Sequence, residues 1–139
     1  MTETVSTGNR DVVDEFRTRG GQVAGFEGQP LLLLHSTGAK SGTRYVNPVA
    51  YLPVGDDFAV FGSRGGSPVN PGWYHNLLAH PDTVVEVGAE TIRVRARVAE
   101  GEERERIWGE QKRANANFAA YEEKTTRSIP VVILERVAS

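Results

Sequence analysis

The segment at residues 37–44 brings together residue types that can bind an anion. Its sequence, Thr-Gly-Ala-Lys-Ser-Gly-Thr-Arg, combines two glycines with hydroxyl side chains and with the cations Lys40 and Arg44. Glycines let the backbone turn and expose consecutive N–H groups, and the cations add charge-assisted hydrogen bonds. The segment therefore predicts a site for phosphate or a similar cluster of anionic oxygens. Its spacing is not that of the nucleotide P-loop, so a plain solvated turn is the alternative.

A second segment, residues 63–76, repeats this pattern further along the chain. Its sequence is SRGGSPVNPGWYHN, and Arg64 supplies another cation beside a pair of glycines. Asn70 or the Pro-Gly pair after it is predicted to open a helix, whose free N–H groups and dipole favour negative charge. Adjacent hairpin strands would bring both segments to the same rim of a barrel. The alternative is structural: Trp73 is then a core anchor and Asn76 a helix-surface amide.

Other familiar catalytic patterns are absent from the sequence. There is no cysteine, which excludes disulfides, thiolate metal sites and cysteine nucleophiles. His75 and His80 face different sides of a helix, and His35 lies in an apolar strand as a satisfied core residue, so no metal site is predicted. Neither Gly-x-Ser-x-Gly nor Gly-x-Gly-x-x-Gly occurs, which argues against an acyl-transfer hydrolase and a Rossmann nicotinamide site. A redox activity would therefore need a borrowed cofactor.

Length and charge narrow the class of protein. A chain of 139 residues is expected to form one compact unit, and a formal net charge of -2 argues against a nucleic-acid-binding protein. Apolar runs such as residues 31–34 fall far short of the roughly 20 residues that span a bilayer. The first ten residues are polar, unlike a secretion signal. We therefore predict a cytoplasmic protein and leave open a peripheral association with the inner face of the membrane.

The hydrophobic periodicity predicts the elements that must position these segments. Residues 1–8 are expected to form a flexible tail and residues 9–139 a single domain. A first helix is predicted from about residue 9 to a Gly-Gly stop at residue 20. The other predicted helices cover residues 73–79, 101–114 and a stretch around 118–121, and the predicted strands cover residues 31–35, 45–53, 58–63, 83–87, 91–98 and 129–135.

The strand pattern predicts a mainly β (α+β) fold. About six mostly antiparallel strands with short helices between them, and no regular βαβ alternation, indicate a closed or split β-barrel with short peripheral helices. In one strand Arg93, Arg95 and Arg97 alternate with apolar residues, which is typical of a sheet with one solvated face. That arginine row is therefore expected to face water rather than a ligand.

In the order and spacing of its motifs, the chain resembles the deazaflavin-dependent nitroreductase family of actinobacteria, relatives of the split-barrel flavin reductases. The similarity covers nearly all of residues 14–136. No single motif is decisive, but together they are specific. They are Glu15-Phe-Arg17, Thr37-Gly-Ala-Lys-Ser-Gly42, Asn47-Pro48, Ser63-Arg-Gly-Gly66, Asn70-Pro-Gly-Trp-Tyr-His-Asn-Leu77, His80-Pro81 and Thr126-Arg-Ser-Ile-Pro-Val131.

The resemblance implies coenzyme F420, an 8-hydroxy-5-deazaflavin with a phosphate and a glutamate tail, as the cofactor. Lys40 and Arg64 stand at the family's charged positions and are expected to hold the tail. Family members often carry an arginine where this chain has Tyr45, and Arg44 one place earlier is the expected substitute. The implied coenzyme-binding residues are Ala39, Lys40, Ser41, Gly42, Arg44, Tyr45, Val46, Asn47, Pro48, Val49, Ala50, Ser63, Arg64, Gly72, Trp73, Tyr74, His75 and Asn76.

The resemblance also implies an acceptor site over the deazaflavin ring, formed by Asn115, Phe118 and Tyr121 and bounded by the N-terminal helix. Tyr121 is the expected catalytic residue, donating a hydrogen bond to an acceptor carbonyl. The implied reaction transfers a hydride from F420H2 to a quinone, an enone or a nitroaromatic compound. An FMN-dependent split-barrel reductase or oxidase and a noncatalytic deazaflavin carrier are the alternatives. Barrel edges and exposed aromatic residues also favour a homodimer.

Overall fold

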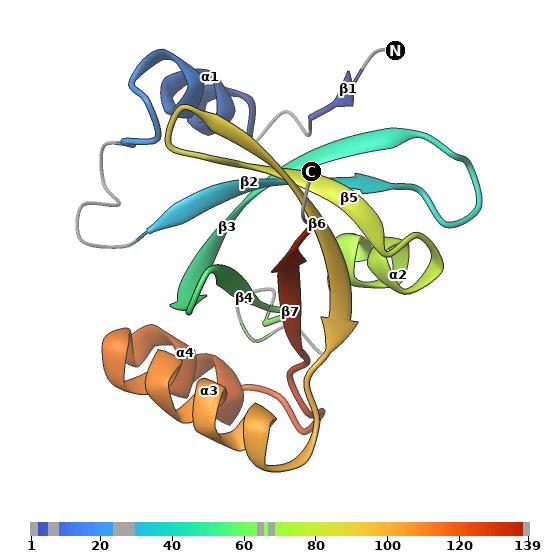
Figure 1. The fold of residues 1–139 in the computed structure, drawn as a ribbon. Helices are drawn as coiled ribbons and strands as arrows, with labels where there is room; N and C mark the ends of the chain where they lie inside the picture. Colours follow the sequence, from blue (N-terminus) through green and yellow to red (C-terminus); the bar gives the residue numbers. More distant parts are fainter. Residues whose placement is uncertain (1–2, 6–8, 24–29, 64–65, 67–68, 138–139) are drawn as a thin grey trace.

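The structure, a computed structural model, is a closed antiparallel β-barrel (Figure 1). It describes residues 3–5, 9–23, 30–63, 66 and 69–137. Pairing runs in the order β3-β2-β5-β6-β7-β4, and β3 also pairs with β4, which closes the barrel. The predicted fold class and both predicted hairpins are therefore confirmed. The barrel strands are β2 (Leu31–Thr37), β3 (Arg44–Val54), β4 (Asp57–Phe61), β5 (Asp82–Val87), β6 (Glu90–Val98) and β7 (Val131–Arg136).

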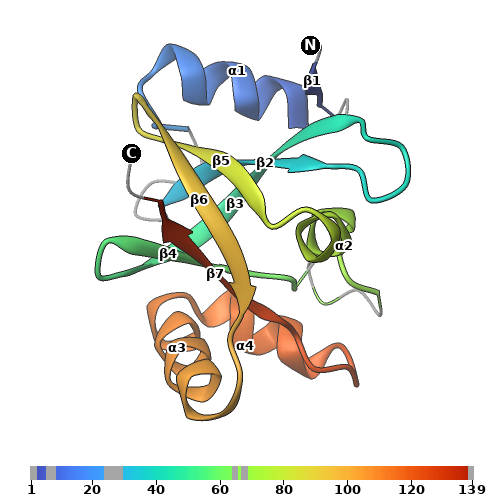
Figure 2. The ribbon, with the colours of Figure 1, turned by 45° about the vertical axis from the view of Figure 1, so that its right-hand side comes forward.

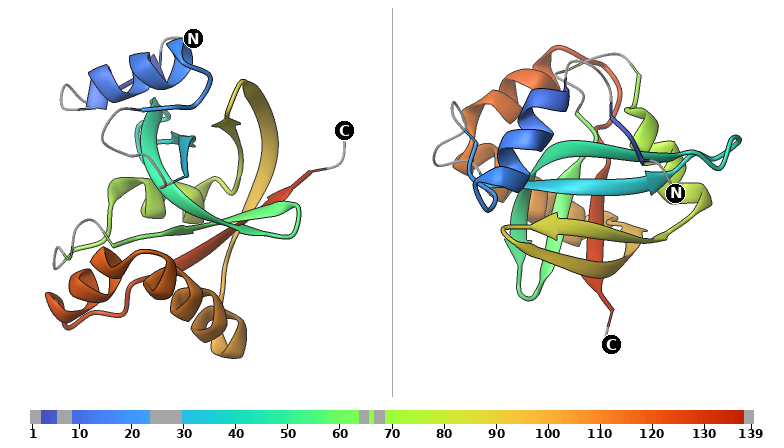
Figure 3. Two further views of the ribbon diagram at one scale, coloured as in Figure 1. Left: turned by 90° about the vertical axis from the view of Figure 1, so that its left-hand side faces the viewer. Right: turned by 90° about the horizontal axis from the view of Figure 1, so that it is seen from above.

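Helices in the described residues cover the outside of the barrel and one of its ends. They are α1 (Arg10–Thr18), α2 (Gly72–Ala79), α3 (Gly101–Ala114) and α4 (Ala116–Glu123). Figures 2 and 3 place α1 and the α3–α4 pair on opposite sides of the barrel, with α2 between them. All four helices lie where the hydrophobic periodicity predicts them.

Strand β2 is buried on both faces, as its run of leucines predicts. Leu32 and Leu34 join a cluster that draws on all the barrel strands, so this cluster is the barrel interior. Trp73 of α2 packs into the same cluster and closes one end of the barrel. Leu33 faces the other way and packs with Phe16 of α1 outside the barrel. The alternation of β2 thus attaches α1 and α2 to opposite faces of one strand.

The α3–α4 pair covers a second outer face of the barrel. Trp108 and Phe118 from these helices pack against Phe61 at the end of β4, with the rings of Phe61 and Phe118 5.7 Å apart. Burial of aromatic rings is a large stabilising contribution, about 1.5–3 kcal/mol for a side chain such as phenylalanine. This cluster fixes α4 beside the end of β4, where the second predicted segment begins.

The arginine row on β6 faces solvent, as the alternation predicts. Arg93, Arg95 and Arg97 are exposed, while Ile92 and Val94, which alternate with them, are buried. Arg95 pairs with Asp82 at 3.0 Å, and Arg97 pairs with Glu103 and Glu135. Local carboxylates therefore balance much of the charge on this face.

The short strand β1 (Glu3–Thr4) lies within the predicted flexible tail. It pairs in parallel with Arg44 and Tyr45 at the start of β3. The sequence does not predict this pairing, because a two-residue strand carries no hydrophobic period of its own. Residues 1, 2 and 6–8 lie outside the described residues, and the flexibility of that part stays a prediction.

Candidate functional site

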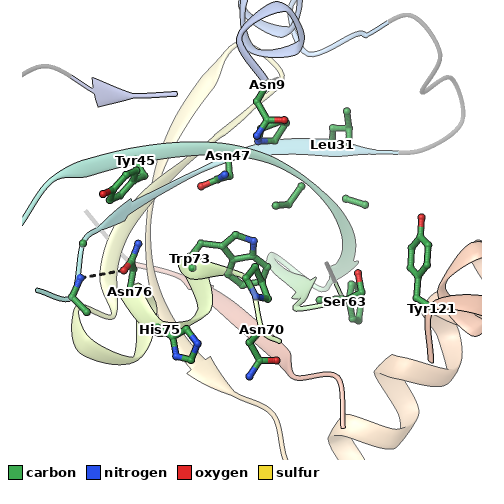
Figure 4. Close-up of a pocket in the computed structure, with 18 of the residues that line it drawn as sticks. Asn9, Leu31, Tyr45, Asn47, Ser63, Asn70, Trp73, His75, Asn76 and Tyr121 are labelled. Atoms are coloured by element: carbon green, nitrogen blue, oxygen red, sulfur yellow. Dashed lines mark hydrogen bonds between the residues drawn. The ribbon is translucent and has the colours of Figure 1, made fainter. Parts of the chain in front are cut away.

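An open cleft of about 1340 Å³ runs from α2 along β3 to α4 (Figure 4). Tyr45 and Asn76 lie at one end of it and Tyr121 at the other, with Asn9 and Leu31 along one side. The volume exceeds the roughly 300–1,000 Å³ of a typical small-molecule pocket. The cleft therefore has room for an extended ligand together with a second small molecule.

The first loop (residues 38–43) forms one end of the cleft and is a tight turn. Gly38 and Thr43 close it through a backbone hydrogen bond of 2.7 Å, and Ser41 Oγ accepts from the N–H of Thr43 at 3.1 Å. A Cβ at position 38 would clash with Ser41 Oγ, so glycine at this position lets the serine keep its hydrogen bond to Thr43. Lys40 lies exposed at the tip. The predicted anion-binding loop is therefore a fixed turn that presents one cation.

Asn76 ties the first loop to α2 through both ends of its side-chain amide. Its Oδ1 accepts a hydrogen bond from the N–H of Ala39 at 3.1 Å, and its Nδ2 donates to Ser36 Oγ at 3.1 Å. Ser36 is 1 % exposed, so this second contact satisfies a buried hydroxyl. Asn76 is thus more than the helix-surface amide of the structural alternative, because it positions the loop beside the helix.

The second loop (residues 62–71) meets the same cleft through Ser63 and Asn70. Its described residue Gly66 has φ +85°, and a Cβ there would lie 2.8 Å from the Cβ of Lys124. The loop therefore lies directly against the C-terminal end of α4. Arg64, the second predicted cation, lies outside the described residues. The described parts of both loops line one cleft, in agreement with the prediction that they share a rim.

Most of the residues expected to bind coenzyme or acceptor line this cleft. From the coenzyme set they are Ala39, Lys40, Ser41, Tyr45, Asn47, Pro48, Val49, Ala50, Ser63, Gly72, Trp73, His75 and Asn76, and from the acceptor set Asn115, Phe118 and Tyr121. Asn115 also caps α4, since its Oδ1 accepts a hydrogen bond from the N–H of Asn117.

The structure places four of the expected coenzyme residues, Gly42, Arg44, Val46 and Tyr74, outside the lining of the cleft. The side chain of Val46 packs in the cluster beneath α1, because alternation along β3 turns it away. Tyr74 packs against the barrel interior. Gly42 completes the first loop with a positive φ of 73°. These packing contacts give each residue a structural role, and its contact with the coenzyme stays a prediction.

Arg44 is turned toward His35, and its expected role as a substitute ligand for the coenzyme stays a prediction. Arg44 Nη2 lies 3.2 Å from His35 Nδ1, and His35 Nε2 lies 2.7 Å from Glu86 Oε2. A guanidinium only donates, so Nδ1 must accept and Nε2 must carry the proton that His35 donates to Glu86. The predicted core role of His35 is confirmed, with hydrogen bonds on both ring nitrogens.

Glu86 also accepts a bidentate pair from Arg17 of α1, with contacts of 2.7 and 3.1 Å. Burial alone would raise the pKa of Glu86, but hydrogen bonds from Arg17 and His35 outweigh it and lower the pKa. This network joins α1 to the strands that flank the first loop. It lies behind the loop rather than in the cleft, so it can position the loop without contacting a ligand.

Several lining residues were not in the expected set. They are Asn9, Leu31, Gly38, Phe61, Asn70 and Pro71. Gly38, Asn70 and Pro71 belong to the two segments that the sequence singles out, so their motif was a usable signal. Asn9 precedes α1, which agrees with the expectation that the N-terminal helix bounds the acceptor site. The sequence around Leu31 and Phe61 predicts only that they are core residues. The tertiary structure shows that both also line the cleft.

The chemistry of the lining suits an anionic, partly aromatic ligand. Lys40 is the one Lys or Arg among the described lining residues, and none of those residues is an aspartate or glutamate. Five asparagines and several hydroxyl groups add hydrogen-bonding capacity, while Phe61, Phe118 and Trp73 supply aromatic surface. A phosphate or carboxylate ligand thus meets donors and a cation without a repelling carboxylate. The residues present therefore fit a coenzyme with an acidic tail and a planar ring.

The described residues contain neither a cluster of metal-binding side chains nor a membrane-spanning helix. No group of three or more His, Cys, Asp or Glu side chains there could hold a metal ion. No helix within the described part of the chain is both long and apolar enough to cross a membrane.

The closed antiparallel barrel with this cleft on its rim defines the split β-barrel class of proteins. The chain belongs to the F420H(2)-dependent quinone reductase family, since that family's model matches residues 8–136. The resemblance predicted from the sequence motifs is confirmed by this match. The family's description refers to quinones, so the nitroreductase part of the resemblance is the looser one.

Individual relatives agree with the family assignment. An F420H(2)-dependent quinone reductase of Mycobacterium tuberculosis strain H37Rv is 40% identical over 110 residues, which cover 77% of this chain and 74% of the relative. A solved F420-H2 dependent reductase is 39% identical with a TM-score of 0.70, covering 76% of this chain and 94% of that one. A structure described as a domain-swapped dimer is 35% identical with a TM-score of 0.72, covering 92% and 95%.

More distant structures share the fold alone. A haem storage protein of Vibrio cholerae matches with a TM-score of 0.61 at 13% identity, covering 93% of this chain and 90% of that chain. A common barrel at this identity carries no information about ligand or reaction. The assignment to a coenzyme F420-dependent reductase family therefore rests on the nearer relatives and on the family model.

Proposed function

We propose that this chain binds reduced coenzyme F420 in the cleft and transfers its hydride to a quinone. The observation that carries the proposal is that the first loop, the second loop and α4 line a single cleft without a described carboxylate. The family match supports F420H2 as the electron donor, and the names of the relatives support a quinone-type acceptor.

The residues expected to bind the coenzyme and those expected to bind the acceptor lie at different ends of the cleft. At the α2 end, Lys40 and the donors of the first loop hold the acidic tail of the coenzyme, and Asn76 keeps that loop in place. Along β3, residues 45–50 form the wall against which the coenzyme lies. When bound, the reduced deazaflavin supplies a hydride from its central ring carbon. The residues need only orient the two reactants, exclude water and stabilise charge on the acceptor.

At the other end, Phe118 and Tyr121 form the acceptor wall. Their rings lie 5.2 Å apart in an edge-to-face arrangement, and Phe118 packs in turn on Phe61. This apolar wall suits a planar uncharged acceptor, since it provides ring contact and no charge. The Tyr121 hydroxyl donates a hydrogen bond to the acceptor oxygen on which negative charge develops. Enones and nitroaromatics meet the same requirements as secondary acceptors.

The decisive experiment separates the donor, the acceptor and the alternatives. Purified protein is titrated with oxidised F420 and, in a separate sample, with FMN, and binding is followed by fluorescence. F420H2 is then supplied with menadione, and protein-dependent reoxidation is followed by absorbance. We expect tighter binding of F420 and reoxidation that depends on the protein. Preference for FMN would reject the cofactor, and tight F420 binding without turnover would indicate the noncatalytic carrier.

A homodimer is part of the proposal. It is supported by the related structure described as a domain-swapped dimer, which covers 92% of this chain. Light scattering after size-exclusion chromatography should give twice the monomer mass of 15.2 kDa, and a monomer mass would reject the dimer. The cytoplasmic location and the peripheral membrane association stay predictions of the sequence.

A further inference from the structure

Arg127, in the segment between α4 and β7, makes three hydrogen bonds to the described residues of the second loop. Its Nη2 donates to the carbonyl oxygens of Gly62 and Ser63, each at 3.0 Å, and its Nη1 donates to Asn70 Oδ1 at 2.6 Å. Arg127 is only partly exposed. Because a guanidinium presents several donors in a rigid plane, this contact fixes both ends of the loop at once.

The contact also fixes which way the amide of Asn70 points. An arginine side chain has donors and no acceptor, so the amide atom that faces Arg127 must be the oxygen. The NH2 group of Asn70 therefore points to the other side. No residue in the described ranges accepts a hydrogen bond from this NH2 group. Asn76 differs, since both ends of its amide bond within the protein.

Asn70 lines the cleft, so a ligand that reaches this residue can accept a hydrogen bond from its NH2 group. Two N–H donors at this position suit an oxygen acceptor, either a phosphate or carboxylate oxygen of the coenzyme tail or a carbonyl of its ring. Asn70 and Arg127 lie on different segments of the chain, 57 positions apart. The donor is thus held by a contact that links the second loop to the segment after α4.

We propose that Arg127 is a positioning residue that holds the amide of Asn70 with its NH2 group toward the cleft, where Asn70 donates a hydrogen bond to an oxygen of the coenzyme. The inference rests on the proposed function. It adds one ligand-contacting residue and one residue that acts through it, neither of which belongs to the expected coenzyme set.

The sharpest test replaces Asn70 with aspartate. In Asn70→Asp, one carboxylate oxygen still accepts from Arg127, so the loop is held, but the other presents an anion in place of a donor. Oxidised F420 binding, measured by fluorescence titration, should weaken by about tenfold or more, the scale of a charge-assisted hydrogen bond. The melting temperature should stay near that of the unchanged protein. The matched control is Asn117→Asp, which adds the same charge at an exposed position of α4.

A second probe locates the oxygen. The deazaflavin riboside without phosphate or glutamates is titrated in the same way. Equal weakening for both probes places the Asn70 contact on the ring, and weakening for F420 alone places it on the tail. Either result supports the inference. Unchanged F420 affinity in Asn70→Asp would overturn it, while the proposed function would survive if the unchanged protein binds F420.

The role of Arg127 is tested by a double-mutant cycle. Arg127→Met and Asn70→Ala should each weaken F420 binding, and the double variant should bind no more weakly than Asn70→Ala, because Arg127 acts through Asn70. Additive losses would reject the positioning role. If Arg127→Met does not fold, Arg127→Lys replaces it in the test. The lysine keeps the positive charge but lacks the planar guanidinium. It is expected to recover only part of the affinity.

Discussion

Asn76 of α2 and Ala39 of the first loop are 37 positions apart in the chain and are joined by a hydrogen bond of 3.1 Å. The same side chain donates to Ser36 near the end of β2, so one amide connects α2 to the end of β2 and to the loop that follows that strand. The first loop is therefore held in place before any ligand binds. In general, a site that is already ordered loses less conformational entropy when its ligand binds.

Replacement of Asn76 should therefore affect stability and binding together. Asn76→Ala removes both hydrogen bonds and leaves the buried Ser36 hydroxyl without its donor, which should lower the free energy of unfolding by about 1–2 kcal/mol. F420 affinity should fall several-fold because the first loop is released. Urea unfolding and fluorescence titration measure the two effects. Leu78→Ala, at an exposed position of the same helix, is the control, and equal F420 affinity in the two variants would contradict the prediction.

Lys40 should contribute to coenzyme binding through its charge. Lys40→Ala is expected to weaken F420 binding by about 1–3 kcal/mol, the range for a charge-assisted contact, with little change in stability because Lys40 is exposed. The loss should shrink as salt is added, since added ions screen an exposed charge. Arg93→Ala removes a cation from the solvated face of β6 and should bind F420 normally. The sequence predicts the same loss for Arg64→Ala, and unchanged affinity in both loop variants would refute the tail site.

Tyr121 should act on the acceptor rather than on the coenzyme. Tyr121→Phe keeps the ring that packs on Phe118 and removes only the hydroxyl group. We expect kcat with menadione to fall by about tenfold, comparable to the loss of one hydrogen bond in the transition state, with unchanged F420 affinity. Stopped-flow reoxidation of bound F420H2 measures the step directly. Tyr51→Phe, which removes a hydroxyl outside the cleft, is the control, and a normal rate in Tyr121→Phe would exclude the hydroxyl from the reaction.

Glu86 should make the stability of the protein sensitive to acid. Its pKa is lowered in the folded state, so its contribution is fully present above the ordinary value of 4.5 and is lost as the pH falls through the lowered pKa. Glu86→Gln should be less stable at neutral pH and should lose less stability on acidification below that value. Melting temperatures across this range, with exposed Glu90→Gln as control, measure the effect. An acid dependence identical to that of the unchanged protein would contradict it.

The elements of the fold are predictable because their signals are local. The leucines of residues 31–34, the alternation around Arg93 to Arg97 and the glycine stops each depend on neighbours a few positions away. The same holds for the anion-binding character of the first loop, which follows from glycine, hydroxyl and cationic residues in one short segment. Two of these local patterns also predict burial correctly. The leucine run of β2 predicts a strand that is buried on both faces, and the alternation of β6 predicts a strand with one buried face.

Only the tertiary structure decided what individual polar side chains do. From the sequence, Arg44 is an equally good partner for a coenzyme or for a core histidine, and its contact with His35 depends on how β2 and β3 pair. The contacts of Asn76 with Ala39 and of Arg127 with Asn70 join positions 37 and 57 residues apart. Such contacts are set by barrel closure and helix packing, and periodicity over a few residues carries no information about them.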